Sequence, residues 1–410
     1  MSEAGIAGAA WLREPPLSKL LAALDRDGEE ARLVGGAVRN ALIGEPVSEV
    51  DLATTALPDE VARRVAAAGF RVVPTGIEHG TVMAVMGGRS FEVTTLRQDV
   101  ETFGRHAKVA FGRDWKADAE RRDFTMNALS ASADGTVYDY VGGLADLAER
   151  RVRFIGDAGK RIAEDYLRIL RFFRFHAAYG RGAPDPDGLA ACIAGRSGLD
   201  LLSRERVRME LMKLLVARQT VPAVVVMAET GLLISVLGGV PDLASFSNMV
   251  KVEAGMGLAA DPARRLGALG VRVAEDAERL WQRLRLTNVE RDRLTHMANA
   301  WWRVSPGSDR AARALLYRLG PGRFVDRVLL AWTRAPAAAT DAAWNSLATL
   351  PARWKAPKFP LKAADFVKRG VEKGPALGAA LRAAEAAWIA ADFPEEHSAI
   401  ASIADAGAKT

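Results

Sequence analysis

The sequence predicts an α+β protein with a mixed sheet in its N-terminal part and helices in the remainder. Up to about residue 150, short runs rich in Val, Thr, Tyr and Phe are separated by turn residues, as is typical of strands. After residue 151, apolar residues recur every three or four positions, as in packed helices. A chain of 410 residues favours roughly two to three domains over one core.

We therefore expect three parts: a head at 1–150, a helical neck at 151–217, and a helical body and tail at 218–410. The expected strands of the head are RLVGG, SEVDLAT, FRVVPTG, TVMAVM, SFEVTTL and VYDYV, and Pro58 to Ala68 is an expected helix. Beyond the head, helical spacing is clearest at Lys160 to Ala178, Ser203 to Ala217, Val273 to Leu286 and Ala376 to Ala391.

The charge distribution favours a polyanionic partner. The net charge is +6, and the segment from Arg150 to Arg174 holds eight basic residues. Such a concentration suits a nucleotide or RNA, although a solvated basic helix would have the same composition. The single cysteine, Cys192, excludes an intramolecular disulfide and a cysteine-based zinc site, so any metal must be held by oxygen or histidine.

Neither the start of the chain nor its most apolar stretch indicates membrane targeting. The first residues include Glu3 and lack a basic leader, so we expect no signal peptide and a cytoplasmic protein. The apolar stretch Val221 to Val240 contains Pro222, Glu229 and Gly231, which favours two short buried helices over a membrane span. We predict no membrane association and no protein partner.

Three acidic residues in expected strands are candidate catalytic groups. Glu49 and Asp51 are two positions apart in SEVDL, so a strand would place both carboxylates on one face. Their repulsion would be relieved by a cation, and oxygen ligands suit Mg²⁺. Glu92 in SFEVTTL could support metal binding or accept a proton. The alternative for all three is ordinary surface charge on a sheet.

A double glycine lies shortly before these acids. Gly35 and Gly36 precede Arg39, and a glycine turn lets backbone amides approach phosphate oxygens at the start of the next helix. Alone, the pair indicates only a turn. Together with the carboxylates, it forms a hypothesis: the glycines hold the phosphates of a nucleotide while the acids hold the metals that act on them.

These residues belong to an ordered set of motifs that resembles the class II tRNA nucleotidyltransferase and bacterial poly(A) polymerase family. The resemblance covers Val34 to about Leu215, and the further motifs are RRDFTMNAL (Arg121 to Leu129), DYVGGLADL (Asp139 to Leu147), EDYLRILRFFRF (Glu164 to Phe175) and SRERVRMEL (Ser203 to Leu211). It implies a polymerase-β-like nucleotidyltransferase head, followed by a helical neck, body and tail that grip tRNA. Members that add CCA extend the tRNA 3′ end from CTP and ATP without a nucleic-acid template.

The resemblance also implies residue roles. Gly36 and Arg39 would contact the nucleotide, while Glu49 and Asp51 would hold two Mg²⁺ ions that activate the 3′-hydroxyl and steady the triphosphate. The ribose 2′-hydroxyl would be read by the next motif, through Arg122 and Asp123.

The next set of implied contacts concerns the base. Asp165 and Arg168 would select it by imitating a base-pairing edge, with Arg171 and Arg174 as further nucleotide contacts. On one continuous helix these four residues, spaced by three, would form a single stripe. Without the resemblance, the stripe is equally a solvated basic face. The segment from Gln98 to Glu120, which includes Gly104 and Gly112, corresponds to the family's flexible loop.

Two departures from the family pattern bear on activity. The first metal ligand is normally aspartate, whereas Glu49 places its carboxylate one methylene further from the backbone, and Asn40 stands where many relatives have aspartate. Alternatives to CCA addition are therefore a catalytically impaired tRNA-binding relative and, within the same family, a poly(A) polymerase. The Gly-Arg-Arg-Phe type signature of the polymerases is missing from the corresponding region, which favours CCA addition.

A basic cluster in the C-terminal part is a candidate RNA contact. It consists of Lys355, Lys358, Lys362, Lys368 and Arg369 in a Pro/Gly-containing segment. Such residues would position tRNA through its phosphates without reading its sequence, although a solvated loop would look the same.

Overall fold

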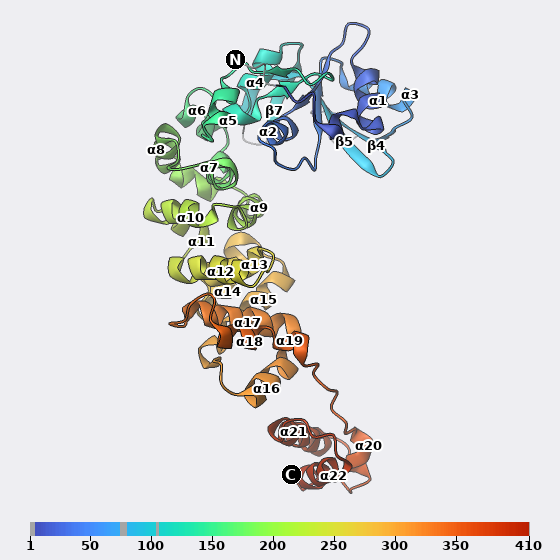
Figure 1. Ribbon diagram of the computed structural model, residues 1–410, viewed down its shortest axis with the longest axis vertical. Helices are drawn as coiled ribbons and strands as arrows, with labels where there is room; N and C mark the ends of the chain where they lie inside the picture. Colours follow the sequence, from blue (N-terminus) through green and yellow to red (C-terminus); the bar gives the residue numbers. More distant parts are fainter. Residues whose placement is uncertain (1–4, 74–79, 104–105, 410) are drawn as a thin grey trace. The chain divides into compact units, whose positions relative to one another are not determined.

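The computed structural model describes residues 5–73, 80–103 and 106–409, apart from the side chains of 98–110. The chain divides into two compact units, Met1–Val236 and Leu237–Thr410. The predicted α+β class is confirmed, because the sheets lie in the N-terminal part and the remainder is helical (Figure 1). The three-part division stays a prediction, since its boundaries at residues 150 and 217 both fall within the first unit.

The first unit is built on a seven-stranded mixed sheet of order β3-β4-β5-β2-β1-β8-β9. In it, β2 pairs in parallel with β5, whereas β1 runs antiparallel to β2 and to β8. All four residues of β1 are buried, as expected for a strand near the centre of a covered sheet. The strands are β1 (Ala31–Val34), β2 (Asp51–Thr54), β3 (Arg71–Val73), β4 (Thr81–Met86), β5 (Arg89–Thr95), β8 (Ser130–Ala131) and β9 (Val137–Tyr138).

A separate antiparallel hairpin follows β5. It consists of β6 (Arg97–Phe103) and β7 (His106–Phe111), and a short helix, α4 (Trp115–Glu120), comes next. The segment from 98 to 120, expected to correspond to the family's flexible loop, contains this hairpin and α4, and its role stays a prediction. Gly104, named in that expectation, lies outside the described residues.

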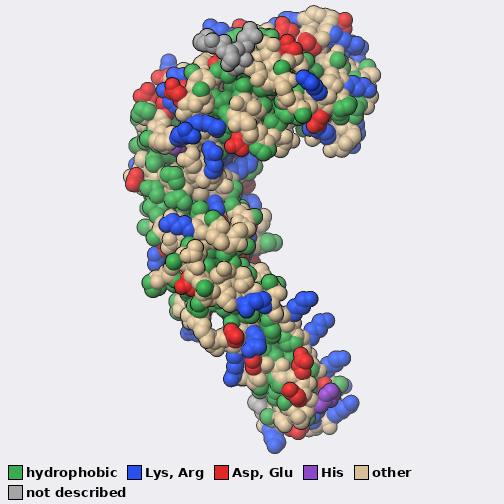
Figure 2. Space-filling view, in the orientation of Figure 1, with side chains coloured by type: hydrophobic (Ala, Val, Ile, Leu, Met, Phe, Trp, Pro, Cys, Tyr) green, Lys and Arg blue, Asp and Glu red, His purple; other side chains and the backbone are tan. Residues whose placement is uncertain are grey.

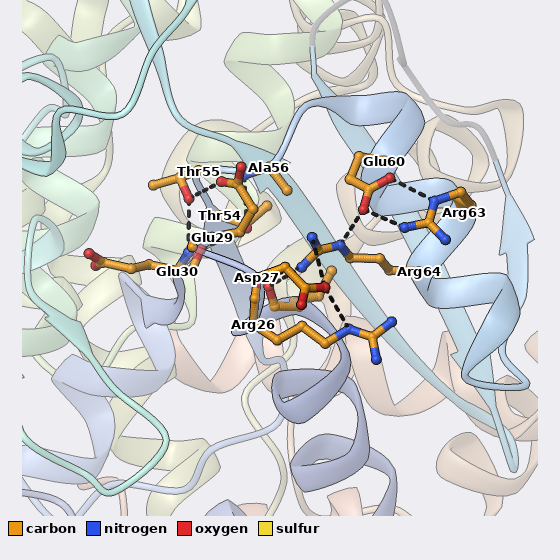
Figure 3. Close-up of polar contacts among 12 residues, drawn as sticks. Arg26, Asp27, Glu29, Glu30, Thr54, Thr55, Ala56, Glu60, Arg63 and Arg64 are labelled. Carbon is orange, nitrogen blue, oxygen red and sulfur yellow. Dashed lines mark hydrogen bonds and ion pairs between the residues drawn. The ribbon is translucent and has the colours of Figure 1, made fainter.

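Two helices of the first unit, α1 (Pro15–Leu24) and α3 (Pro58–Ala67), are joined by a buried arginine. Arg64 of α3 is 4% exposed and donates to the carbonyl oxygens of Leu24 (3.2 Å) and Arg26 (2.8 Å) and to the carboxylate of Glu60 (2.5 Å; Figure 3). Because these acceptors satisfy the buried guanidinium, Arg64 fixes α3 to the turn between α1 and β1.

The remaining α-helices of the first unit comprise one that follows β1 and a series that follows the last strand of the sheet. They are α2 (Gly36–Leu42), α5 (Gly143–Ala148), α6 (Ala158–Glu164), α7 (Leu167–Tyr179), α8 (Pro186–Ala194), α9 (Arg204–Leu215), α10 (Thr220–Glu229) and α11 (Leu232–Leu237). The expected single helix from 160 to 178 is divided into α6 and α7. The apolar stretch 221–240 forms two short helices, as predicted, and among the described residues no helix is long and apolar enough to cross a membrane.

The second unit is helical. Its longest central helix, α17, buries Phe324, Val328 and Trp332, and it packs against α12, α13 and α15. A C-terminal group of three helices encloses Phe366 and Ala384. The helices are α12 (Leu243–Gly255), α13 (Pro262–Gly270), α14 (Ala274–Leu284), α15 (Asn288–Ala298), α16 (Asp309–Leu319), α17 (Pro321–Arg334), α18 (Ala342–Ala348), α19 (Leu350–Arg353), α20 (Ala363–Val367), α21 (Pro375–Ala390) and α22 (His397–Gly407).

Candidate functional site

The candidate site begins at one end of the parallel pair of strands β2 and β5, where the charges of three acidic residues act on one another. Asp51 is the first residue of β2, and the strand register places it directly beside Glu92 of β5. The pKa of Asp51 is raised from 3.8 to about 6, chiefly by desolvation and then by the negative charges of Glu92 and Glu49, which the positive charge of Arg122 only partly offsets. This end of the sheet therefore carries concentrated negative charge that a bound cation would neutralise.

The carboxylate pair differs from the sequence expectation in one respect. β2 begins at Asp51, so Glu49 lies before the strand, and alternation along a strand does not explain its position. Both residues nevertheless line the same cavity. The donor set, two carboxylates with a third beside them, fits Mg²⁺, although the described residues contain no preformed group of three or more metal-ligating side chains.

The double glycine forms the turn into α2. Gly35 has a φ of 66° and caps α2, and its backbone N–H donates to the carbonyl oxygen of Leu129. The positive φ is the reason that this turn requires glycine, and a Cβ atom at Gly35 would in addition lie 3.3 Å from the Nη1 atom of Arg122. Gly35 and Gly36 both line the cavity that contains the carboxylate pair.

Arg39 of α2 is 6% exposed and makes several protein contacts. Its guanidinium donates to the Oδ1 atom of Asn127 (2.5 Å) and to the hydroxyl of Tyr179 (2.7 Å), and it also lies 3.9 Å from the centre of the Tyr179 ring. It donates to the Oδ1 atom of Asn40 as well. Arg39 thus connects the glycine turn to the end of α7 while lining the cavity.

The RRDFT segment is fixed on both sides. Asp123 accepts hydrogen bonds from the backbone N–H of Phe124 (2.9 Å), from Asn127 (3.1 Å) and from Arg171 of α7 (2.5 and 2.8 Å). Burial acts to raise the pKa of Asp123, but Arg171 and these hydrogen bonds outweigh it and hold the pKa below its ordinary value. The fully buried Phe124 ring packs against Phe175 of α7, with ring centres 5.3 Å apart.

The four residues of the expected stripe do not all lie on one helix. Asp165 has extended backbone between α6 and α7, where its carboxylate accepts from the backbone N–H of Leu167 (3.1 Å) and from Arg206 of α9 (2.6 Å). Arg168 lies in the first turn of α7 and donates to Glu164 (2.5 Å) and to the carbonyl oxygen of Arg161 (2.7 Å). The expected stripe was wrong for Asp165, because this residue lies in the interruption between α6 and α7 and not on the helix that carries the arginines.

The other two arginines of that expectation form ion pairs. Arg171 pairs with Asp123, and Arg174 donates to the buried carboxylate of Glu210 on α9. Glu210 also lies 3.8 Å from Arg171. Both guanidinium groups are therefore connected to the neighbouring helix or to the RRDFT segment as well as lining the cavity.

One cavity of about 600 Å³ brings most of the predicted site together. The predicted residues that line it are Gly35, Gly36, Arg39, Glu49, Asp51, Arg122, Asp123, Asp165, Arg168, Arg171 and Arg174. Glu92 lies beside Asp51 in the sheet and is not among the lining residues. The lining residues that sequence reasoning did not single out are Arg121, Asn127, Leu167, Phe175 and Arg206. Each lies within or next to a motif, but its side-chain direction could not be read from spacing.

The basic cluster of the C-terminal part lies in the second unit. All five side chains of the cluster are exposed: Lys355, Lys358, Lys362, Lys368 and Arg369. Arg369 also forms an ion pair with Asp405, at 2.8 Å. Figure 2 shows basic side chains along the side of this unit that carries the segment between α19 and α20. The cluster is thus available to solvent.

A sheet with paired carboxylates at one strand end, beside a cavity lined by guanidinium groups, suits metal-assisted transfer of a phosphoryl or nucleotidyl group. Residues 31–153 match the poly A polymerase head domain, and residues 183–246 match the probable RNA and SrmB-binding site of polymerase A. The chain is 36% identical to the Danio rerio mitochondrial CCA tRNA nucleotidyltransferase 1 over 88% of this chain and 83% of the relative. The chain therefore belongs to the class II tRNA nucleotidyltransferase and poly(A) polymerase family.

Further relatives carry the same name or share the fold. The CCA-adding enzyme of Limosilactobacillus fermentum is 32% identical over 89% of this chain and 90% of the relative. The crystal structure of the Bacillus stearothermophilus CCA-adding enzyme in complex with CTP is 28% identical, with a TM-score of 0.77, over 97% of this chain and 98% of that chain. The family and the nucleotidyltransferase class predicted from the motifs are thus confirmed.

Proposed function

We propose that this protein adds C, C and A stepwise to the 3′ end of tRNA, using CTP and ATP and selecting each base with its own side chains. The observation that carries the proposal is the single cavity that unites the carboxylate pair, the glycine turn and the Asp165 and Arg168 side chains. The names of the relatives that match over most of the chain support CCA as the product.

Glu49 and Asp51 would hold two Mg²⁺ ions, whose chemistry is to make the tRNA 3′-hydroxyl a better nucleophile and to neutralise the triphosphate. The raised pKa of Asp51 supports this assignment, because the repulsion among Asp51, Glu92 and Glu49 is relieved when a cation is bound. Glu92, on the neighbouring strand, supports the pair and is the nearest candidate to accept the proton of the attacking hydroxyl.

The nucleotide would lie between the glycine turn and the RRDFT segment. Gly35 and Gly36 permit close approach of its phosphates, and Arg39 holds the turn against α7 and adds positive charge. Arg122 and Asp123 would face the ribose 2′-hydroxyl. The contacts of Asp123 with Arg171 and Asn127 fix its carboxylate as an acceptor, which favours ribonucleotides over deoxyribonucleotides.

Base selection would depend on one acceptor and one donor held by separate helices. Arg206 fixes the Asp165 carboxylate from α9, and Glu164 fixes the Arg168 guanidinium from α6. The remaining lone pairs and N–H groups can match C or A and mismatch U and G. Arg171 and Arg174, which pair with Asp123 and Glu210, contribute mainly by fixing the wall against which the base lies.

The tRNA would be held by the helical neck, body and tail. Lys355, Lys358, Lys362, Lys368 and Arg369 would contact phosphates, which fixes the position of the RNA without reading its sequence. The proposed location is the cytoplasm, whereas the Danio rerio relative is named as mitochondrial.

A single-nucleotide extension assay tests the proposal. Purified protein and Mg²⁺ are incubated with a tRNA transcript that ends at the discriminator base, with CTP, ATP or both. CCA synthesis predicts two added residues with CTP alone and three with both nucleotides. A long product with ATP alone on many RNAs would indicate a poly(A) polymerase. Binding of tRNA without extension in any lane would indicate an inactive relative.

A further inference from the structure

A buried carboxylate in α4 binds two neighbouring arginines of the cavity. Asp118 is 3% exposed and is not itself among the residues that line the cavity. Its Oδ1 atom accepts from Nε (2.9 Å) and Nη2 (2.5 Å) of Arg121, and its Oδ2 atom accepts from Nε (3.3 Å) and Nη2 (3.1 Å) of Arg122. One carboxylate therefore fixes the same edge of two guanidinium groups.

This arrangement leaves the opposite edge of each guanidinium for a ligand. Within the described part of the chain, the Nη1 atom of Arg121 has no hydrogen-bond partner, and the Nη1 atom of Arg122 makes only a long contact, 3.4 Å, with the carbonyl oxygen of Asn127. Both arginines line the cavity that also contains Glu49 and Asp51. Both arginines therefore belong to the cavity in which the nucleotide is proposed to lie.

Two adjacent guanidinium groups repel one another unless an anion lies between them. Burial of Asp118 opposes its ionisation, but Arg122 and Arg121 outweigh that effect and keep its pKa below the ordinary value. The backbone is fixed as well, because Arg161 donates to the carbonyl oxygens of Arg121 and Arg122. The three side chains together retain one positive charge, which suits a polyanion.

We propose that Asp118 is a positioning residue that presents the Nη1 edges of Arg121 and Arg122 to the incoming ribonucleoside triphosphate. This inference rests on the proposed function and adds two residues to it, Arg121 as a nucleotide contact and Asp118 as the group through which both arginines act. Asp118 touches neither the nucleotide nor the reacting atoms, so its effect is on nucleotide binding and not on the chemical step.

Kinetics of the Asp118→Asn variant test this role. Removing the charge releases both guanidinium groups, so KM for CTP is expected to rise by about 10-fold, the scale of one lost charge-assisted contact, while KM for tRNA stays unchanged and kcat changes less than KM. Combining Asp118→Asn with Arg121→Ala or with Arg122→Ala should give less than the sum of the two single effects. Adding Asp118→Asn to the Arg121→Ala/Arg122→Ala double variant should change little, because Asp118 acts only through these two arginines.

The matched control is Asp114→Ala. Asp114 caps the same helix through the backbone N–H groups of Lys116 and Ala117 and contacts neither arginine, so its loss should lower Tm without changing KM for CTP. If Asp118→Asn does not fold, Asp118→Glu keeps the charge but displaces it, and an increase in KM for CTP that exceeds that of Asp114→Ala is then expected.

Equilibrium binding of CTP separates this inference from the proposed function. If the wild-type protein binds CTP but adds no nucleotide, the proposed function fails, and a weaker CTP affinity in the Asp118 variant still supports the positioning role. An unchanged CTP affinity and KM in a folded Asp118 variant would overturn the inference. Fully additive effects of the Asp118 and arginine variants would overturn it as well.

Discussion

Asp51→Asn should stabilise the metal-free protein while removing a metal ligand. The pKa of Asp51 is about 6 in the folded chain, against an ordinary value of 3.8, because of desolvation and the charges of Glu92 and Glu49. At pH 7.5 this difference corresponds to a cost of about 3 kcal/mol for keeping the carboxylate ionised. Asp51 is exposed as a residue although its carboxylate is crowded by neighbouring groups, so solvent screening reduces the cost to about 1 kcal/mol.

Because folding raises the pKa of Asp51, ionisation of this carboxylate lowers the stability of the folded state. Well below pH 3.8 the carboxylate is protonated in both states, so the folded protein carries no cost there. The cost develops as the pH rises towards 6 and is complete above it. In EDTA at pH 7.5, the asparagine variant should therefore unfold in its first unit about 2–4 °C higher than wild type, and the difference should shrink to about half at pH 5.

Calorimetry with and without Mg²⁺ measures both effects. Mg²⁺ at ten times its Kd should stabilise the wild-type first unit by about 1.4 kcal/mol and should have little effect on Asp51→Asn. Asp25→Asn, an exposed acid in the same unit, serves as the control and should change neither quantity. The reasoning would be refuted by an Asp51→Asn variant that is less stable than wild type in EDTA at pH 7.5, or that gains as much from Mg²⁺.

Three further outcomes are expected. Glu49→Asp should change the extension rate by less than about 10-fold if glutamate is an adequate ligand, whereas appearance of activity only in that variant would identify the natural chain as inactive. Arg168→Ala should reduce discrimination between CTP and UTP by about 10-fold or more in competition assays; a uniform loss of rate with unchanged selectivity would contradict its role. Replacing Lys355, Lys358 and Lys362 by Gln should weaken tRNA binding and lower its salt dependence, measured as the slope of log affinity against log salt concentration, and an unchanged slope would exclude phosphate contacts.

The fold class and most of the residues that line the cavity could be predicted from the sequence. The lining residues could be predicted because residues of the same motifs lie close together in space, even where the predicted helix or strand was wrong. Glu49 illustrates this: it precedes β2 instead of lying within it, yet it lines the cavity with Asp51. The register of β2 with β5, which puts Glu92 beside Asp51, depends on pairing between distant segments and could not be read from local spacing.

Hydrogen-bond partners were the least predictable part of the site. Spacing by three suggested that Asp165 continues the arginine stripe of α7. Instead, the helix is interrupted at Asp165, whose carboxylate accepts hydrogen bonds from the Leu167 backbone N–H and from Arg206. Asp118 carried no signal in the sequence, since a single acid in a short helix is usually on the surface. Its importance became visible only when both of its arginine partners were located.

The central claim is that the protein itself selects C and A without a template. The most direct measurement is to sequence the 3′ ends of tRNA transcripts, initially ending at the discriminator base, after extension with all four ribonucleotides at equal concentration. We predict that nearly all extended molecules end in CCA and stop there. Ends of mixed sequence, or tails of A alone, would contradict the claim.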